Sequence, residues 1–135
     1  MSSAHRWMLD TNMVSYLIRN THPNVRKQVA RRPQAALCIS AVTRSELLYG
    51  IARNPQATRI AAVIHEFLRW VDTLDWTRAI ADRHGALRAE LERKGIGLLD
   101  QMIAAHALAL DLTLVTNDRA LGRIKGLRVE NWAVA

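Results

Sequence analysis

Short apolar runs alternate with longer amphipathic segments, and this alternation is the feature of the sequence that most constrains the fold. The runs lie at 7–9, 36–39 and 112–115, with weaker ones at 71–74 and 127–129. Between them, apolar residues recur three or four positions apart, as they do on one side of a helix. Strands that alternate with helices form βαβ units and a parallel sheet. The pattern predicts an α/β fold of three layers, α/β/α, with a central parallel sheet of four or five strands.

The helices are predicted from the same periodicity and from residues that start or stop helices. They are expected at 11–19, 24–32, 40–53, 55–70, 77–94 and 100–110. Ser40 is expected to cap the third of these, and Pro55 to open the fourth. Small side chains let the last helix lie close to the sheet; they are Ala104, Ala105, Ala107 and Ala109.

The size and composition suit one domain, residues 1–135, in a reducing compartment. Half of the 135 residues are hydrophobic, enough for a core without metal or disulfide crosslinks. The one cysteine, Cys38, lies in an apolar run, so we expect a buried, unreactive thiol. No secretory segment or bilayer-spanning stretch is evident, so we expect a cytoplasmic protein with no membrane partner.

The charge balance favours a polyanionic partner. Nineteen Lys and Arg against twelve Asp and Glu give a net charge of +7, and sixteen of the nineteen are Arg. Guanidinium groups bind phosphates through a planar fork, which favours nucleic acid. A protein with solvated basic faces would have the same composition, so charge alone leaves both interpretations open.

Four acids are placed where they could face the carboxyl edge of a parallel sheet. Asp10 closes the first strand and Asp118 follows the strand at 112–115. Glu46 lies about two turns into the helix after the second strand, and Asp100 begins its own helix. Ligands of open parallel sheets bind beyond the carboxyl ends of the strands. The four side chains could therefore face one crevice.

Such a cluster of like charges would require a cation. Mg²⁺ or Mn²⁺ would suit, because both prefer oxygen ligands and support hydrolysis of phosphodiesters. The sequence lacks zinc-ligand spacing, a nucleophile elbow and a phosphate-binding glycine loop. Taken singly, each acid could instead be a helix cap, a turn former or an exposed helix residue.

The residues around these acids resemble the four motifs of PIN-domain nucleases, in order. The matching segments are Met8-Leu9-Asp10-Thr11-Asn12, 39–50 around Glu46, 100–107 from Asp100, and Leu114-Val115-Thr116-Asn117-Asp118. Segments 88–95 and 126–132 look like the linker helix and C-terminal strand of VapC toxins. The resemblance runs from Met8 to Trp132.

This resemblance implies a PIN-like fold and metal-binding, catalytic roles for Asp10, Glu46, Asp100 and Asp118. It also implies supporting polar roles for Asn12 and Thr116. Many relatives carry a second acid and an aromatic residue shortly after the fourth motif, whereas this chain has Ala120 and Leu121. Either one carboxylate is missing or Asp118 serves alone, which bears on a second metal.

The resemblance to VapC further implies an endoribonuclease toxin of a type II toxin–antitoxin system. It would cleave structured RNA, such as tRNA, and be inhibited by a cognate VapB-type antitoxin. The alternative is a PIN-like module that binds RNA or antitoxin without cutting.

Two further predictions concern surfaces. We expect a basic group close in sequence to Asp118 to contact RNA: Arg119, Arg123, Lys125 and Arg128. We also expect a homodimer, because 11–19 and 40–53 carry more apolar residues than one sheet face needs; the candidates are Tyr16, Leu17, Tyr49 and Ile51.

Overall fold

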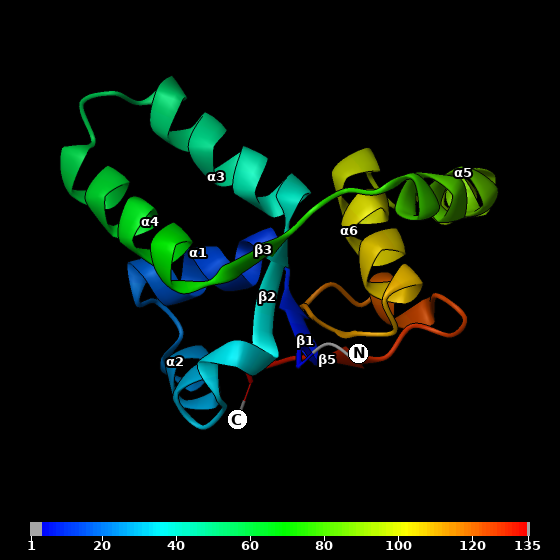
Figure 1. Cartoon of the computed structure of the whole chain (residues 1–135), viewed down its shortest axis with the longest axis horizontal. Coiled ribbons are helices and arrows are strands. Elements are labelled where there is room, and N and C mark those ends of the chain that lie inside the picture. The colour runs from blue at the N-terminus through cyan, green and yellow to red at the C-terminus, as the bar shows by residue number, and fades with distance from the viewer. Residues whose placement is uncertain (1–3, 135) are drawn as a thin grey trace.

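Residues 4–134 of the computed structural model are described, and a parallel sheet runs through their middle (Figure 1). Its strands are β1 (Trp7–Leu9), β2 (Leu37–Ser40), β3 (Asp72–Leu74), β4 (Thr113–Val115) and β5 (Val129–Glu130). They lie in the order β3-β2-β1-β4-β5, and all four pairings are parallel. The predicted five-strand alternative is therefore confirmed.

Helices cover both faces of this sheet. They are α1 (Thr11–Arg19), α2 (Pro23–Ala30), α3 (Ala41–Arg53), α4 (Thr58–Trp70), α5 (Arg78–Arg93) and α6 (Leu98–Ala109), with short 3₁₀ turns at Gln34–Ala36 and Leu121–Arg123. In Figure 1, α1 and α4 lie on one side of the strands and α5 and α6 on the other, which is the predicted three-layer arrangement. Within 4–134, no helix has the length and hydropathy needed to cross a bilayer.

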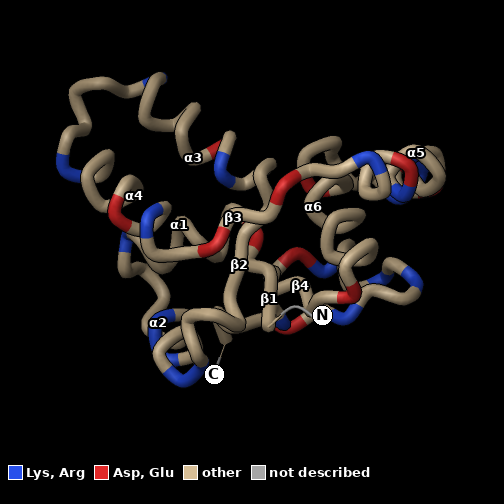
Figure 2. The backbone as a smooth tube through the Cα atoms, in the orientation of Figure 1, with Lys and Arg blue, Asp and Glu red and all other residues tan. Residues whose placement is uncertain are grey.

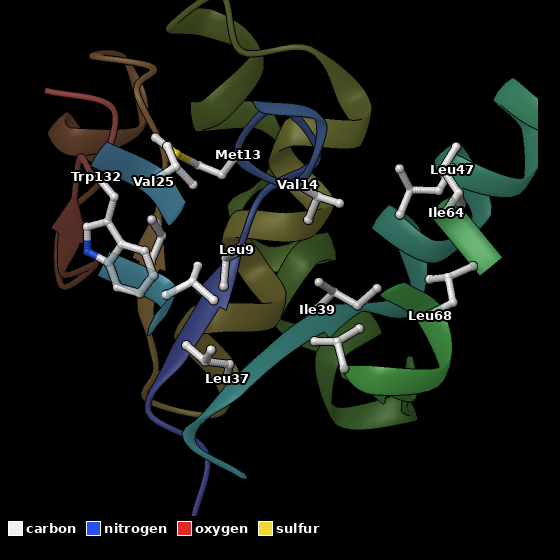
Figure 3. Close-up of a cluster of buried hydrophobic side chains, with 13 residues drawn as sticks. Leu9, Met13, Val14, Val25, Leu37, Ile39, Leu47, Ile64, Leu68 and Trp132 are labelled. Carbon is white, nitrogen blue, oxygen red and sulfur yellow. The ribbon is translucent and has the colours of Figure 1, made fainter. Parts of the chain in front are cut away.

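Alternate residues of the central strands point into two separate cores. Leu9, Ile39 and Val115 pack with side chains of α1, α2 and α4 (Figure 3). Their neighbours Met8 and Leu114 pack instead against α5 and α6. A strand buried on both faces has no place for polar side chains, so polar residues collect where the strands end.

Cys38 occupies the second core, as predicted. It is fully buried, its Sγ donates to the Trp7 carbonyl at 3.5 Å, and burial raises its pKa to about 12. The thiol therefore stays protonated at neutral pH and unreactive.

The strand order creates a switch point at β1. After β1, the chain adds β2 and β3 along one edge of β1 and later adds β4 and β5 along its other edge. At such a switch point an α/β sheet offers room for a ligand beyond the carboxyl ends of its strands. We refer to this place, beyond the carboxyl ends of β1 and β4, as the crevice.

Two helix starts differ from the predictions. Pro55 does not open α4; it lies in a turn closed by a hydrogen bond from the Ala57 N–H to the Asn54 carbonyl at 3.1 Å, and the helix begins at Thr58. The helix α6 begins at Leu98 with Gly97 as its N-cap, so Asp100 lies inside the first turn. By contrast, Ser40 caps α3 as predicted, its Oγ accepting from the Val42 N–H.

The Arg32 side chain stacks on two tryptophan rings and connects α2 and the C-terminal segment to the sheet. The Arg32 guanidinium lies 4.6 Å from the ring centroid of Trp7 and 4.1 Å from that of Trp132. Its Nη1 also donates to the carbonyl and side-chain oxygens of Gln28, at 2.8 and 2.7 Å. The Trp132 side chain is buried, so this cluster ties α2 and the C-terminal segment to β1.

We predict that Arg32→Ala lowers the free energy of unfolding by about 2 kcal/mol, because two cation–π contacts, the hydrogen bonds to Gln28 and an ion pair with Glu130 are lost together. Arg31→Ala is the matched control, since this neighbouring side chain is exposed and should change stability by less than about 0.5 kcal/mol. Urea unfolding monitored by tryptophan fluorescence measures both. Equal effects of the two substitutions would show that the stacked cation adds nothing.

Candidate active site

Asp10 and Asp118 follow the two adjacent strands β1 and β4. Asp10 is the N-cap of α1, and its Oδ1 accepts from the Met13 N–H at 2.9 Å. Its own N–H donates to the Val115 carbonyl, which holds the residue against the end of β4. Asp118 caps a turn by accepting from the Ala120 N–H at 2.9 Å. Asp10 therefore does cap a helix and Asp118 does form a turn, and these hydrogen bonds also orient the two carboxylates.

Thr116 connects these two acids. It is buried, its hydroxyl is hydrogen-bonded to the Asp10 carboxylate, and the same oxygen accepts from the Asp118 N–H at 3.1 Å. One hydroxyl therefore fixes a carboxylate after β1 and the backbone of the loop after β4. Its predicted supporting role has a definite geometric basis.

Glu46 reaches the crevice from the second turn of α3. Its Oε1 accepts from the Thr11 hydroxyl at 2.6 Å, and Thr11 Oγ1 also lies 3.2 Å from Thr43 Oγ1. The hydrogen bond joins α3 to the first residue of α1. Sequence reasoning missed Thr11, although a hydroxyl residue immediately after a strand-end acid is the available signal.

Asp100 is supported by its neighbour Gln101, which sequence reasoning also missed. The Gln101 side chain is buried, and its Nε2 donates to the Ile96 carbonyl at 2.7 Å. Its Oε1 lies 3.1 Å from Nε2 of the buried His84 on α5. These contacts fix the first turn of α6, and with it Asp100, against the loop that follows α5.

A second buried histidine connects the helices that carry Glu46 and Asp100. His106 on α6 is fully buried, and its Nδ1 lies 2.7 Å from the Ser40 hydroxyl at the start of α3. Burial lowers the pKa of His106 to about 4, although Asp75 acts in the opposite direction, so the ring is neutral at pH 7. His106 therefore packs between α6 and the start of α3 and does not join the carboxylates.

The carboxylates of Asp10 and Asp100 are affected by burial and by the charges of neighbouring acids. Burial raises the pKa of Asp10 to about 6, with further contributions from Asp100 and Asp118, while the hydrogen bonds from Thr116 and Met13 oppose the rise. The pKa of Asp100 is also raised, first by burial and then by the charges of Asp118 and Glu46. The fold therefore holds Asp10, Asp118 and Glu46 close enough to Asp100 for their charges to interact with it, and Asp118 close enough to Asp10.

These residues suit a divalent cation by donor type and charge. The crevice offers carboxylate oxygens with hydroxyls behind them, and a positive ion would relieve the repulsion that raises the pKa values. In residues 4–134, however, no three Asp, Glu, His or Cys side chains stand arranged to enclose an ion. The site is thus an acidic crevice and not a preformed cage.

Two hollows meet beside Glu46, and neither is lined by Asp10 or Asp118. One, of about 400 Å³, is lined by Thr11, Asn12, Glu46, Asp100 and residues 97–99. The other, of about 240 Å³, shares Thr11, Asn12 and Glu46 and continues between α1, α3 and the start of α4. Asn12 therefore borders both hollows, and its supporting role stays a prediction.

The basic group predicted to contact RNA is spread out. Arg128 forms an ion pair with Asp111 at 2.9 Å and lies beside Thr113, at the end of β4 opposite Asp118. Arg119, Arg123 and Lys125 are exposed in the segment that follows Asp118. Contact of Arg119, Arg123 and Lys125 with RNA stays a prediction, and the position of Arg128 does not favour it.

The apolar residues assigned to a dimer interface are mostly used within the chain. Tyr16, Leu17 and Ile51 pack against the core between the sheet and α1–α4, whereas Tyr49 is exposed. Tyr16 also accepts a hydrogen bond from Asn117 at 2.8 Å. Tyr16, Leu17 and Ile51 are thus partly buried within the chain, Tyr49 remains an exposed candidate, and the homodimer stays a prediction.

A three-layer fold with acids collected at the carboxyl edge of the sheet defines the class of PIN domains. The PIN domain family matches residues 7–127, and the chain belongs to this family.

Its relatives place it among the VapC proteins. It is 42% identical over 131 residues to the tRNA(fMet)-specific endonuclease VapC of Shigella flexneri, covering 95% of this chain and 98% of that protein. The DNA-bound VapBC structure from Salmonella typhimurium has a TM-score of 0.86 and 38% identity, with 95% and 98% covered. VapBC2 of Rickettsia felis, bound to a promoter DNA fragment, has a TM-score of 0.82 and 31% identity, with 93% and 98% covered.

The buried charge of Asp10 predicts a pH-dependent stability. The folded chain holds this proton more tightly than the unfolded chain, whose Asp has a pKa near 3.8. The contribution of Asp10 to the free energy of unfolding is therefore most favourable below pH 4 and falls as pH rises through about 6, by about 3 kcal/mol.

Asp10→Asn should remove this loss while keeping the cap to the Met13 N–H. In EDTA, we expect the variant to be more stable than the parent at pH 7.5, by up to about 3 kcal/mol, and equal to it near pH 4. Urea unfolding at both pH values measures this, with the exposed Asp82→Asn as control. A variant less stable than the parent at pH 7.5 would contradict the assigned cost of ionising Asp10.

Proposed function

We propose that this chain is a single-domain, metal-dependent endoribonuclease toxin whose catalytic, metal-binding acids are Asp10, Glu46, Asp100 and Asp118. The supporting observation is that separated segments bring the carboxylates of Asp10, Asp118 and Glu46 close enough to Asp100 for their charges to interact with it. The close relation to a tRNA(fMet)-specific endonuclease favours a structured cytoplasmic RNA, tRNA above all, as substrate.

The side chains have distinct tasks in this proposal. A divalent cation, Mg²⁺ or Mn²⁺, would supply a Lewis acid beside the scissile phosphate when bound by the carboxylates. Thr116 holds the Asp10 carboxylate next to the loop that carries Asp118, and Thr11 holds the Glu46 side chain toward α1. Asn12 is exposed at the edge of the crevice, where its amide can bind the RNA backbone.

We also propose that a VapB-type antitoxin inhibits the enzyme. Neighbouring structures of 31% and 38% identity are VapBC complexes, and both are bound to DNA. By analogy, the chain would meet its antitoxin in a complex that binds promoter DNA.

A second candidate function is binding of RNA or antitoxin without cleavage. Ala120 stands where many relatives have another acid, and the described residues do not form a preformed ion cage. Only a cleavage assay separates this candidate from the enzyme.

We predict that the purified chain cleaves folded initiator tRNA in the presence of Mg²⁺ or Mn²⁺ and that EDTA stops the cleavage. Attack by water leaves a 5′-phosphate and a 3′-hydroxyl, whereas attack by the ribose 2′-hydroxyl would leave a cyclic phosphate. Asp10→Asn should reduce cleavage at least about 100-fold, because the carboxylate charge is lost. It should also relieve growth arrest when the chain is expressed without antitoxin.

Circular dichroism must first show that Asp10→Asn is folded. Electrophoresis of end-labelled tRNA with phosphatase and kinase treatment identifies the product ends. If the folded variant cuts as fast as the parent, the assignment of Asp10 is wrong. If the parent binds tRNA but never cuts it, the non-cleaving candidate stands instead.

A further inference from the structure

The hollow of about 240 Å³ leads away from the carboxylates along α3 and is not needed to hold a metal. Thr11, Asn12 and Glu46 border it at the acidic end, where it joins the hollow beside Asp100. Figure 1 shows α3 leading away from the end of β2 and α4 returning toward the sheet. The hollow therefore continues from the proposed cleavage site to the periphery of the molecule.

Its far end is basic. Arg19, at the end of α1, and Arg53, at the end of α3, both line the hollow and are exposed. Figure 2 shows Lys or Arg also in the region where α3 passes into α4. Polar groups of Ser15 and Asn54 lie between apolar side chains on the wall. A polyanion repelled by the acids at one end of the hollow would be held by the guanidinium groups at the other.

An aromatic ring stands beside this basic end. Tyr49 is 64% exposed on α3, between Glu46 and Arg53 in the sequence. The Arg53 guanidinium lies 5.3 Å from its ring centroid. An aromatic face paired with arginine is a sequence-tolerant platform for a nucleobase. Tyr49 has no comparable role inside the fold, unlike the neighbouring Leu47, which is buried in the core.

We propose that Tyr49, Arg53 and Arg19 form an RNA subsite, where a base stacks on the tyrosine and the two guanidinium groups hold phosphates. This proposal rests on the proposed endoribonuclease function and extends it to residues outside the four motifs. Seven positions of α3 separate Glu46 from Arg53, a rise of about 10 Å. At about 3.4 Å per stacked nucleotide, the subsite holds the RNA about three nucleotides from the cleaved bond.

The first test measures binding of fluorescein-labelled initiator tRNA by anisotropy, in an Asp100→Asn background with Mg²⁺. We expect Tyr49→Ala to weaken binding about tenfold and Tyr49→Phe to restore it, because the ring and not the hydroxyl stacks. Arg19→Ala with Arg53→Ala should lower the slope of log affinity against log salt by about 1.4, at about 0.7 for each phosphate contact to a single strand.

The matched control is Arg93→Ala, which removes one exposed guanidinium from the end of α5, on the other side of the sheet. It should leave the affinity within about twofold. In the chain with Asp100 intact, Tyr49→Ala should raise KM about tenfold and leave kcat within about twofold, because Tyr49 would stack on a base and would not contact the scissile phosphate.

The outcomes separate this proposal from the function it extends. If the parent chain fails to cut RNA, the endoribonuclease proposal fails, while anisotropy still tests the subsite. If Arg93→Ala weakens binding as much as Arg53→Ala, charge acts without a subsite and the proposal is overturned. It is also overturned if Tyr49→Ala binds tRNA like the parent but no longer retains a co-expressed antitoxin, because the hollow would then serve that protein.

Discussion

Four carboxylates of like charge meet above β1 and β4, and the fold must keep them there against their repulsion. Burial and neighbouring charges raise the pKa of Asp10 to about 6, so ionisation of this group at neutral pH opposes folding. Two separately packed cores supply the opposing free energy, because the central strands are buried on both faces. The hydrogen bonds around the acids oppose this repulsion, because a hydroxyl, an amide or the start of a helix holds each acid in place.

Each of the supporting contacts joins two segments that are distant in sequence. Thr116 links the residues after β1 and β4, while Thr11 links α1 to Glu46 on α3. His106 links α6 to the start of α3 through Ser40. A displacement of any one helix is thereby resisted by its neighbours, which is what keeps groups that repel each other at fixed separations.

The architecture and the acids were predictable because both follow from periodicity and from the position of acids at strand ends. Asp10 and Asp118 lie beyond β1 and β4, as a parallel sheet requires. The supporting residues were harder to predict, since the pairing of Gln101 with His84 depends on how α5 packs on α6. The prediction that Pro55 opens α4 was wrong because proline suits a turn as well as the first turn of a helix. Arg128 is near Asp118 in sequence but at the other end of a strand in space.

The strand order has a consequence for synthesis of the protein. β4, which lies directly beside the central strand β1, is translated after β1, β2 and β3, and Asp118 follows it. A chain whose synthesis has not yet reached β4 lacks a strand that pairs with β1, one of the four acids and the hydroxyl of Thr116 that fixes Asp10. The proposed catalytic centre would therefore be complete only after β4 and Asp118 have been made. Truncated products that stop before β4 would lack this centre.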